Sequence, residues 1–333
     1  MGGDYAPARP VEGALAAARN LGVGVDLVGR ADLIDAELRR HADARALDLR
    51  VIDAPDVIDM AESPAKALRR KPGASIRVAA DHVAAGHARA LFSAGHTGAT
   101  VVAAHAAFGM LPGADRPALA PTVPTRQGAA VLLDAGATVE CRPAHLLQFA
   151  HMGATYSRVG LGVERPRVGL LSIGEEASKG NELTREAHRL LKASALAFVG
   201  NVEARGIFSS EADVVVCDGF TGNVALKLSE GLVEMVEDLL GDELQSTFSS
   251  QVGYLLSRRA FRRFRKRVDY SEFGGAPLLG VAGLCIVGHG RSSVKAVRNA
   301  VAMASRMASN QMMDRLRTEM TSVAAATAQN AGR

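Results

Sequence analysis

The chain is 333 residues long, and 48% of its residues are hydrophobic and 22% charged, with 34 glycines and no tryptophan. A chain of this length and composition can bury a large core, which excludes an intrinsically disordered protein and predicts a globular one. Its formal net charge of +4 is small, so only a local concentration of basic residues would indicate an anionic partner.

Short runs rich in β-forming residues alternate with helical patterns along the chain. This alternation predicts βαβ units on a mainly parallel sheet. Ligands of such sheets gather at the carboxyl ends of the strands, so the residues just after each run are the candidates for chemistry. The runs lie at residues 25–29, 50–54, 90–95, 167–174, 197–201, 212–219 and 282–288.

Three segments do not follow this alternation of strands and helices. Residues 108–127 are rich in Pro, Gly and Ala, which indicates an ordered connection with extended pieces. Residues 239–268 read as a long helical stretch without a strand, which predicts a helical arm that projects from the sheet. Periodicity is lost after residue 318, so we expect a single α/β domain over residues 1–320 and a frayed tail over residues 321–333.

Several predicted strands are followed by a glycine-containing turn that leads into a helix, and we call each such turn a corner. The first corner is SAGHTGA at residues 93–99. Its glycines permit close backbone approach, Ser93 and Thr97 supply hydroxyl donors, and the following helix start supplies unpaired N–H groups. This combination is typical of an anion site. A glycine turn needed only for helix packing would have the same pattern.

The second corner, GEEASKGNEL at residues 174–183, mixes carboxylates with a lysine. Lys179 is able to bind a phosphate or an oxyanion, and Asn181 and Glu182 stand where the next helix is predicted to start. The alternative interpretation is a solvated charged loop that ends in a helix cap.

Two further corners, CDGFTGNV and GHGRSS, repeat the strand–turn–helix arrangement. The first places Asn223 at a helix start that presents backbone donors to an anion, and it places Cys217 in an apolar strand, where we interpret it as a buried structural thiol. The second resembles a dinucleotide fingerprint, but Ser293 replaces the third glycine and the expected acidic residue is missing, so it favours an anion over a nicotinamide cofactor.

A basic amphipathic helix is predicted around SRRAFRRFRKR, residues 257–267. At about 100° per residue, Leu256, Ala260, Phe261, Phe264 and Val268 share one arc and the opposite side is basic. Such a helix suits an acidic protein partner or anionic lipid head groups; nucleic acid ranks below both, because no binding motif is present. Simple packing by the apolar side is the alternative. The basic residues are Arg258, Arg259, Arg262, Arg263, Arg265 and Lys266.

The three cysteines, Cys141, Cys217 and Cys285, are far apart and form no CxxC pair. Neither a disulfide framework nor a zinc site is therefore expected, and a reducing cytoplasm is the expected compartment. No apolar run approaches the length of a membrane span, the start lacks a secretory pattern, and Ala6 stands where a myristoylation signal has Ser or Thr.

In this order, the motifs resemble the bacterial phosphate acyltransferase family called PlsX over nearly the whole chain. The pieces that carry the resemblance are MGGDYAP, SPAKALRRKPGASI, SAGHTGA, LLQFAHMG, RVGLLSIGEEASKGNELT, FVGNVE, DVVVCDGFTGNVALK and FGGAPLLG. The resemblance implies a Rossmann-like three-layer α/β/α fold related to the isocitrate and isopropylmalate dehydrogenases. It also implies a homodimer, associated peripherally with the inner face of the membrane, that transfers an acyl group from acyl carrier protein to inorganic phosphate in phospholipid synthesis. No cofactor and no metal are expected.

A mechanistic hypothesis assigns roles to these residues, because all of them follow predicted strands. Lys179 and Asn223 are expected to orient phosphate and stabilise an oxyanion, with Asn181 and Glu182 positioning the lysine. Phosphate itself is expected to be bound by the SAGHTGA corner, with the MGGD turn shaping the loop; the residues are Ser93, Gly95, His96, Thr97, Gly98 and Asp4.

Three features differ from the family's usual pattern. Members usually have a short apolar strand before MGGD, so the sheet is expected to lack one strand or the start to be misassigned. His96 and Thr138 stand where the family usually has Asn; an imidazole still donates to an anion, but its charge changes near neutral pH. Two competing classes stay open: a non-catalytic acyl-carrier-binding protein and an NAD-dependent decarboxylating dehydrogenase of similar fold.

Overall fold

The computed structural model describes residues 1–331, and the side chains of residues 1–269 and 271–326. The helices are α1 (Ala8–Leu21), α2 (Ala31–Leu38), η1 (Ala44–Ala46), α3 (Pro64–Arg70), α4 (Ser75–Ala84), α5 (Thr97–Phe108), α6 (Pro143–Gly160), α7 (Glu182–Ala193), η2 (Ala204–Phe208), α8 (Gly219–Gln245), α9 (Phe248–Val268), η3 (Tyr270–Glu272), α10 (Val294–Ser309) and α11 (Met312–Ala331). The strands are β1 (Val25–Gly29), β2 (Leu49–Asp53), β3 (Leu91–Ser93), β4 (Ala118–Leu119), β5 (Thr122–Thr125), β6 (Gly128–Leu133), β7 (Arg167–Leu171), β8 (Ala197–Val202), β9 (Val214–Val216), β10 (Ala276–Leu279) and β11 (Cys285–Val287).

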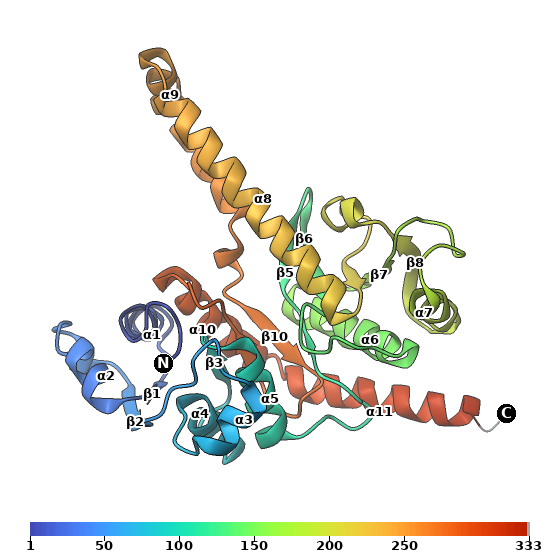
Figure 1. Ribbon diagram of the computed structural model, residues 1–333, viewed down its shortest axis with the longest axis horizontal. Coiled ribbons are helices and arrows are strands. Elements are labelled where there is room, and N and C mark those ends of the chain that lie inside the picture. Colours follow the sequence, from blue (N-terminus) through green and yellow to red (C-terminus); the bar gives the residue numbers. More distant parts are fainter. Residues whose placement is uncertain (332–333) are drawn as a thin grey trace.

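Within residues 1–331 the strands form three sheets, with helices packed around them (Figure 1). One sheet has the order β5-β6-β9-β7-β8, and all its pairs are parallel except β5 with β6. Another has the order β3-β11-β10-β4, with β3 and β11 parallel. The third is the parallel pair β1-β2. The α/β class with mainly parallel pairing is therefore confirmed.

Each of the seven predicted runs overlaps a strand, and the connection at residues 108–127 contains β4 and β5 as its extended pieces. The sequence analysis missed β6 and β10. Strand β10 includes Pro277, which cannot donate a hydrogen bond to a neighbouring strand, so its presence argues against a strand when the sequence is read alone. In the structure Pro277 only accepts, through its carbonyl from the amide of Ala120.

Helix α6 anchors the larger core. It packs against β9, α7 and α11, and its side chains Phe149 and Met152 are fully buried. A methyl group on Gly153 would lie 2.6 Å from Cγ1 of Val214, so a glycine is needed for the helix to approach the sheet this closely. The buried hydroxyl of Tyr156 is satisfied by Thr122 Oγ1 at 3.0 Å.

The strands β1 and β3 are not joined by any strand in the described residues. A cavity of about 530 Å³ is lined by both strands and by α1, α4 and α10. The amino group of Met1 is buried here, and burial lowers its pKa.

The predicted arm is present, but it starts earlier than expected. Helices α8 and α9 form a hairpin that projects far from the sheets (Figure 1), and α8 begins at Gly219, directly after the CDGFTGNV corner. Of the expected apolar arc of α9, Phe261 and Phe264 line the groove beside α8, together with Tyr254, whose ring is tilted against that of Phe261 with centroids 5.4 Å apart. Leu256, in contrast, is 82% exposed. No helix in the described part of the chain has both the length and the apolar character needed to cross a membrane.

The C-terminal region is helical up to Ala331, contrary to the expectation of a frayed tail. Leu316, Met320 and Val323 lie at helical spacing and are buried, and α11 packs against α6. The alanine-rich sequence hides this apolar stripe. Residues 332 and 333 lie outside the described residues, and the division into a single domain over residues 1–320 stays a prediction.

The first turn of α8 packs directly against the loop after β6. A methyl group on Gly222 would lie 1.9 Å from the carbonyl oxygen of Asp134 and 2.8 Å from Sγ of Cys217. On Gly219 it would lie 2.6 Å from the carbonyl oxygen of Thr138. Backbone meets backbone at these two positions, so only glycine fits without displacing the helix.

We predict that Gly222→Ala destabilises the protein by about 3 kcal/mol or more, because the new methyl group overlaps fixed backbone. Gly231→Ala in the same helix is the matched control, since nothing lies within 4 Å of a methyl group there. That control should be neutral or stabilising by up to about 1 kcal/mol, through helix propensity. Urea unfolding measures both; equal effects would contradict the packing described.

Candidate active site

Three corners distant in the sequence meet at the ends of β3 and β11. The amide of Asp4 donates to the carbonyl of Gly290 at 2.9 Å, and a methyl group on Gly3 would lie 2.7 Å from the carbonyl oxygen of Ala94. Arg291 lies 3.7 Å from the Asp4 carboxylate. The MGGD turn, the SAGHTGA corner and the GHGRSS corner therefore form one continuous backbone surface.

Ser93 ends β3 and organises this surface. Its Oγ accepts a hydrogen bond from the Gly95 amide at 3.3 Å, and its carbonyl accepts from the Gly288 amide. The Ser93 Oγ also lies 3.0 Å from Thr100 Oγ1, whose one hydrogen has the His96 carbonyl oxygen as a second acceptor at 3.2 Å. The Ser93 hydroxyl thus belongs to a hydrogen-bonded group at the start of α5.

His96 is the N-cap of α5, and both of its ring nitrogens are engaged. Nδ1 accepts from the Ala99 amide at 3.4 Å, and Nε2 lies 3.2 Å from the carbonyl oxygen of Glu62, to which it can only donate. This arrangement selects the neutral tautomer with its proton on Nε2. The imidazole therefore caps the helix and leaves the backbone N–H groups of Thr97 and Gly98, in the first turn of α5, to face an anion.

A second group of corners follows β6, β9 and β7, which are adjacent parallel strands and so end at one edge of their sheet. Asn223, the fifth residue of α8, lies here, with its side chain 3.6 Å from where Gly136 would carry a methyl group. Asp218 caps that helix by accepting from the Thr221 amide at 2.9 Å. Asn223 is exposed at this edge.

Lys179 lies on the loop after β7 and is exposed. Asn181 is the N-cap of α7, where its Oδ1 accepts from the Thr184 amide at 2.9 Å, and Glu182 is the first residue of that helix. No hydrogen bond or ion pair in the described residues joins either one to the lysine side chain. Any positioning of Lys179 by these two residues therefore runs through the backbone of the loop.

Asp134 is the residue of this group that the sequence analysis missed. Its fully buried carboxylate accepts from the amides of Leu119, Gly136, Ala137 and Thr138, at 2.7, 3.0, 3.0 and 2.6 Å. Burial raises its pKa to about 6, although the four amide donors act in the opposite direction. The available signal was an aspartate followed by Ala-Gly directly after an apolar run.

Helix α8 links the two groups of corners. One turn beyond Asn223, Lys227 lies 3.4 Å from Nδ1 of His289, and Glu230 accepts from Nε2 of His289 at 2.9 Å. Burial alone would raise the pKa of Glu230, but His289 and Lys227 outweigh it and the pKa lies below its ordinary value. The N-terminal part of α8, from which the arm projects, therefore contacts the GHGRSS corner through His289.

Cys217 lies buried at the end of β9, with its Sγ 3.4 Å from the Asp134 carbonyl. Burial first, and then the negative charge of Asp134, raise its pKa well above the ordinary value. A thiol held in this form is a poor nucleophile. Its interpretation as a structural thiol is therefore confirmed.

The basic residues of α9 fall into two sets. Arg258, Arg262 and Arg265 line the groove between α8 and α9, and Arg265 lies 3.5 Å from Glu237. Arg259, Arg263 and Lys266 are exposed on other sides of the helix. The second set is therefore exposed to solvent and does not line the groove.

Sequence comparison identifies the family. The family model described as "Fatty acid synthesis protein" matches residues 1–315. The chain belongs to this family. A curated relative from Syntrophotalea carbinolica, named phosphate acyltransferase, is 51% identical over 316 residues, covering 95% of this chain and 91% of the relative. The recognition made from the motifs is confirmed, and the acyltransferase class is favoured over the dehydrogenase alternative.

Solved structures support the fold. A phosphotransacetylase from Streptococcus pyogenes aligns with a TM-score of 0.59 at 15% identity, covering 89% of this chain and 91% of that one. A structure from Salmonella typhimurium, described as a putative 4-hydroxythreonine-4-phosphate dehydrogenase, aligns with a TM-score of 0.50 at 12% identity. The alignment covers 90% of this chain and 97% of that one. At these identities the likeness concerns the fold alone, and it confirms a dehydrogenase-like α/β architecture.

We predict a specific pH dependence for Asp134. Because its pKa is raised from 3.8 to about 6, the folded protein binds this proton more tightly than the unfolded chain does. Stability from this group is therefore highest at low pH and falls as the pH rises from about 4 to about 7, by about 3 kcal/mol in total.

The measurement is the difference in unfolding free energy between the wild type and Asp134→Asn across that range. Taking the difference removes the contributions of all other titrating groups. It should fall with rising pH; a constant difference would mean that the carboxyl group titrates alike in the folded and unfolded states.

Proposed function

We propose that this protein transfers a fatty acyl group from acyl carrier protein to inorganic phosphate. The observation that carries the proposal is the meeting of three glycine-bearing corners around the start of α5, in a chain of the fatty acid synthesis family. Backbone N–H groups at a helix N-terminus, together with hydroxyl donors, suit a tetrahedral oxyanion. Phosphate would be bound by the Ser93 hydroxyl and by the amides of residues 95–98, with Asp4 holding the neighbouring turn.

The reaction needs no covalent intermediate on the protein. A phosphate oxygen attacks the thioester carbonyl carbon, negative charge develops on the carbonyl oxygen, and the carbon–sulfur bond then breaks. The carrier leaves as a thiolate that takes up a proton. The contribution of the protein is to hold the two reactants together and to stabilise the developing charge.

Lys179 and Asn223 are the proposed stabilising groups. They stand after β7 and at the start of α8, at the same edge of one sheet, and both are exposed to a substrate. Asn181 fixes the loop that carries Lys179 by capping α7, and Glu182 begins that helix. Asp134 shapes the backbone beside Asn223.

We predict that Lys179→Ala and Asn223→Ala each lower the rate of acyl-phosphate formation by about a hundredfold or more, the usual effect of removing one donor to an oxyanion. Both side chains are exposed, so the melting temperature should stay nearly unchanged. Hydroxylamine trapping of acyl phosphate measures the rate. Lys192→Ala, an exposed lysine later in α7, is the control and should act as the wild type; wild-type rates in either test variant would exclude that residue from catalysis.

The arm is proposed to contact an acidic carrier protein and the anionic membrane surface. Exposed cations on α9 suit both partners, and apolar side chains near its start, Phe248 and Leu255, are 82% and 68% exposed. A peripheral location at the cytoplasmic face of the membrane follows from this proposal. Nucleic acid is not proposed as a partner.

A homodimer is proposed from the exposed side of α8. Six apolar residues recur along it at spacings of three or four: Phe220, Val224, Leu228, Leu232, Met235 and Leu239. Each is at least half exposed, and together they form one stripe along the helix. A stripe of this kind on a soluble surface is typical of a protein interface.

We predict that reversing the outward cations, in the triple variant Arg259→Glu, Arg263→Glu and Lys266→Glu, abolishes binding to phosphatidylglycerol vesicles or raises KM for the acyl carrier substrate at least about tenfold. Loss of attraction and new repulsion both act in this direction. Vesicle sedimentation and initial rates measure the two effects.

The matched control reverses exposed arginines away from the arm, Arg39, Arg45 and Arg69. It changes the net charge equally and should leave both measurements as in the wild type. If the arm variant also behaves as the wild type, the basic surface of α9 serves neither partner and has only a packing role.

A further inference from the structure

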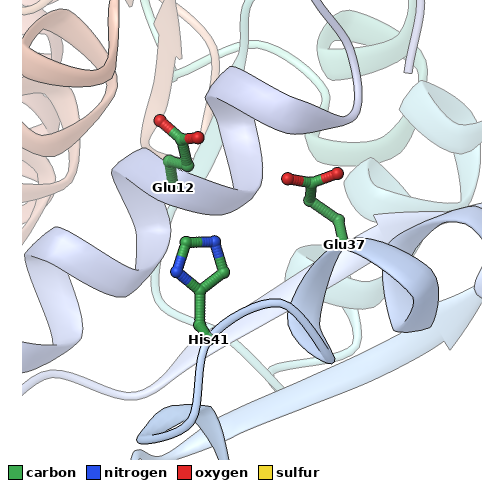
Figure 2. Close-up of side chains that lie close together, drawn as sticks. All are labelled: Glu12, Glu37 and His41. Carbon is green, nitrogen blue, oxygen red and sulfur yellow. The ribbon is translucent and has the colours of Figure 1, made fainter.

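A cluster of metal-ligating side chains lies away from the proposed active site, between the first two helices. Glu12 comes from α1, Glu37 from the end of α2, and His41 from the turn that follows α2 (Figure 2). One ligand atom from each residue lies within 4.8 Å of those of the other two. The imidazole is directed towards the space between the two carboxylates (Figure 2).

The polar atoms of this cluster are not satisfied by one another. Nε2 of His41 is buried and has no hydrogen-bond partner among the described residues. Glu37 is 7% exposed, and its one ion pair in that part of the chain uses Oε2 alone, with Arg40 at 2.8 Å. No ion pair or side-chain hydrogen bond of the described residues involves Glu12. A buried nitrogen without a partner beside two carboxylates is costly unless something binds between them.

The spacing fits a cation. Three atoms no more than 4.8 Å apart all lie within about 2.8 Å of a common point, which is 4.8 Å divided by the square root of three. Metal–ligand distances to nitrogen and carboxylate oxygen are about 2.0–2.2 Å for zinc, so side-chain shifts of well under 1 Å would complete the coordination. A direct His–Glu hydrogen bond would need a much closer approach.

We propose that Glu12, Glu37 and His41 bind a divalent transition-metal ion of the zinc class. The neutral imidazole nitrogen favours such an ion over magnesium or calcium, which prefer oxygen ligands. Two carboxylates with the nearby Arg40 leave a net charge of −1, which a divalent ion outweighs. The fourth ligand position would be left to water.

The role of the site is structural. Helix α1 follows the MGGD turn, which forms part of the proposed phosphate surface, and α2 belongs to the outlying β1-α2-β2 unit (Figure 1). A metal held by both helices ties this unit to α1. None of the three ligands lines the corners proposed for catalysis, so the site and the proposed enzyme activity are tested separately.

The test uses the full chain after dialysis against a chelator, titrated with zinc chloride in a calorimeter and followed by thermal unfolding. The wild type should bind one zinc ion tightly and gain melting temperature. His41→Ala and Glu12→Gln should each weaken this binding at least about tenfold, since changes even behind the ligands cost about that much. Each variant should also lose the zinc-dependent rise in melting temperature.

His105→Ala is the matched control, because His105 is an exposed histidine far from the cluster. It should bind zinc as the wild type does. Glu12→Gln keeps the shape of an accessible helix side chain, so it serves if His41→Ala fails to fold. Unchanged zinc affinity in the Glu12 and His41 variants, or equal loss in the control, would overturn the proposal.

Discussion

The contact between the start of α8 and the loop after β6 is the constraint on which the rest of the site depends. Gly219 and Gly222 remove the side chains that would hold the helix away, and the Asp134 carboxylate gathers four amides so that the loop presents a fixed surface. The carboxylate is buried among backbone dipoles, so it fixes a conformation at the cost of a raised pKa. Position and direction of α8 are both set there.

Several properties follow from that direction. Asn223, the fifth residue of α8, lies beside Gly136, and Lys227 and Glu230 further along the helix reach His289 at the other group of corners. The same helix then continues outward and carries the apolar stripe and the basic α9. Helix α8 therefore couples the proposed catalytic edge to the proposed partner surface through a continuous hydrogen-bonded element, without a flexible linker between them.

The proposed metal cluster shows a different use of the fold. Its ligands are 25 and 4 residues apart in the sequence and include no cysteine, so they match no short ligand motif. Helix packing, not local spacing, brings them together. The expectation that the chain has no metal site was drawn from its cysteines, and it could not take account of side chains that meet only across two helices.

The sequence by itself determined the family, the alternation of strands and helices and the glycine corners, because these depend on short-range patterns of side-chain size and polarity. It also predicted the arm and its basic helix. The cap that Asn181 makes with the Thr184 amide is local and agrees with the helix cap considered for its loop. Only the tertiary structure decided that Nε2 of His96 lies against the Glu62 carbonyl and that Asp134 is buried among amides. Those roles depend on which backbone groups lie opposite each side chain, and chain segments far apart in the sequence supply several of them, such as the Glu62 carbonyl and the Leu119 amide. The helix at residues 312–331 was likewise decided by burial against α6, since its alanine-rich sequence carries a weak pattern of its own.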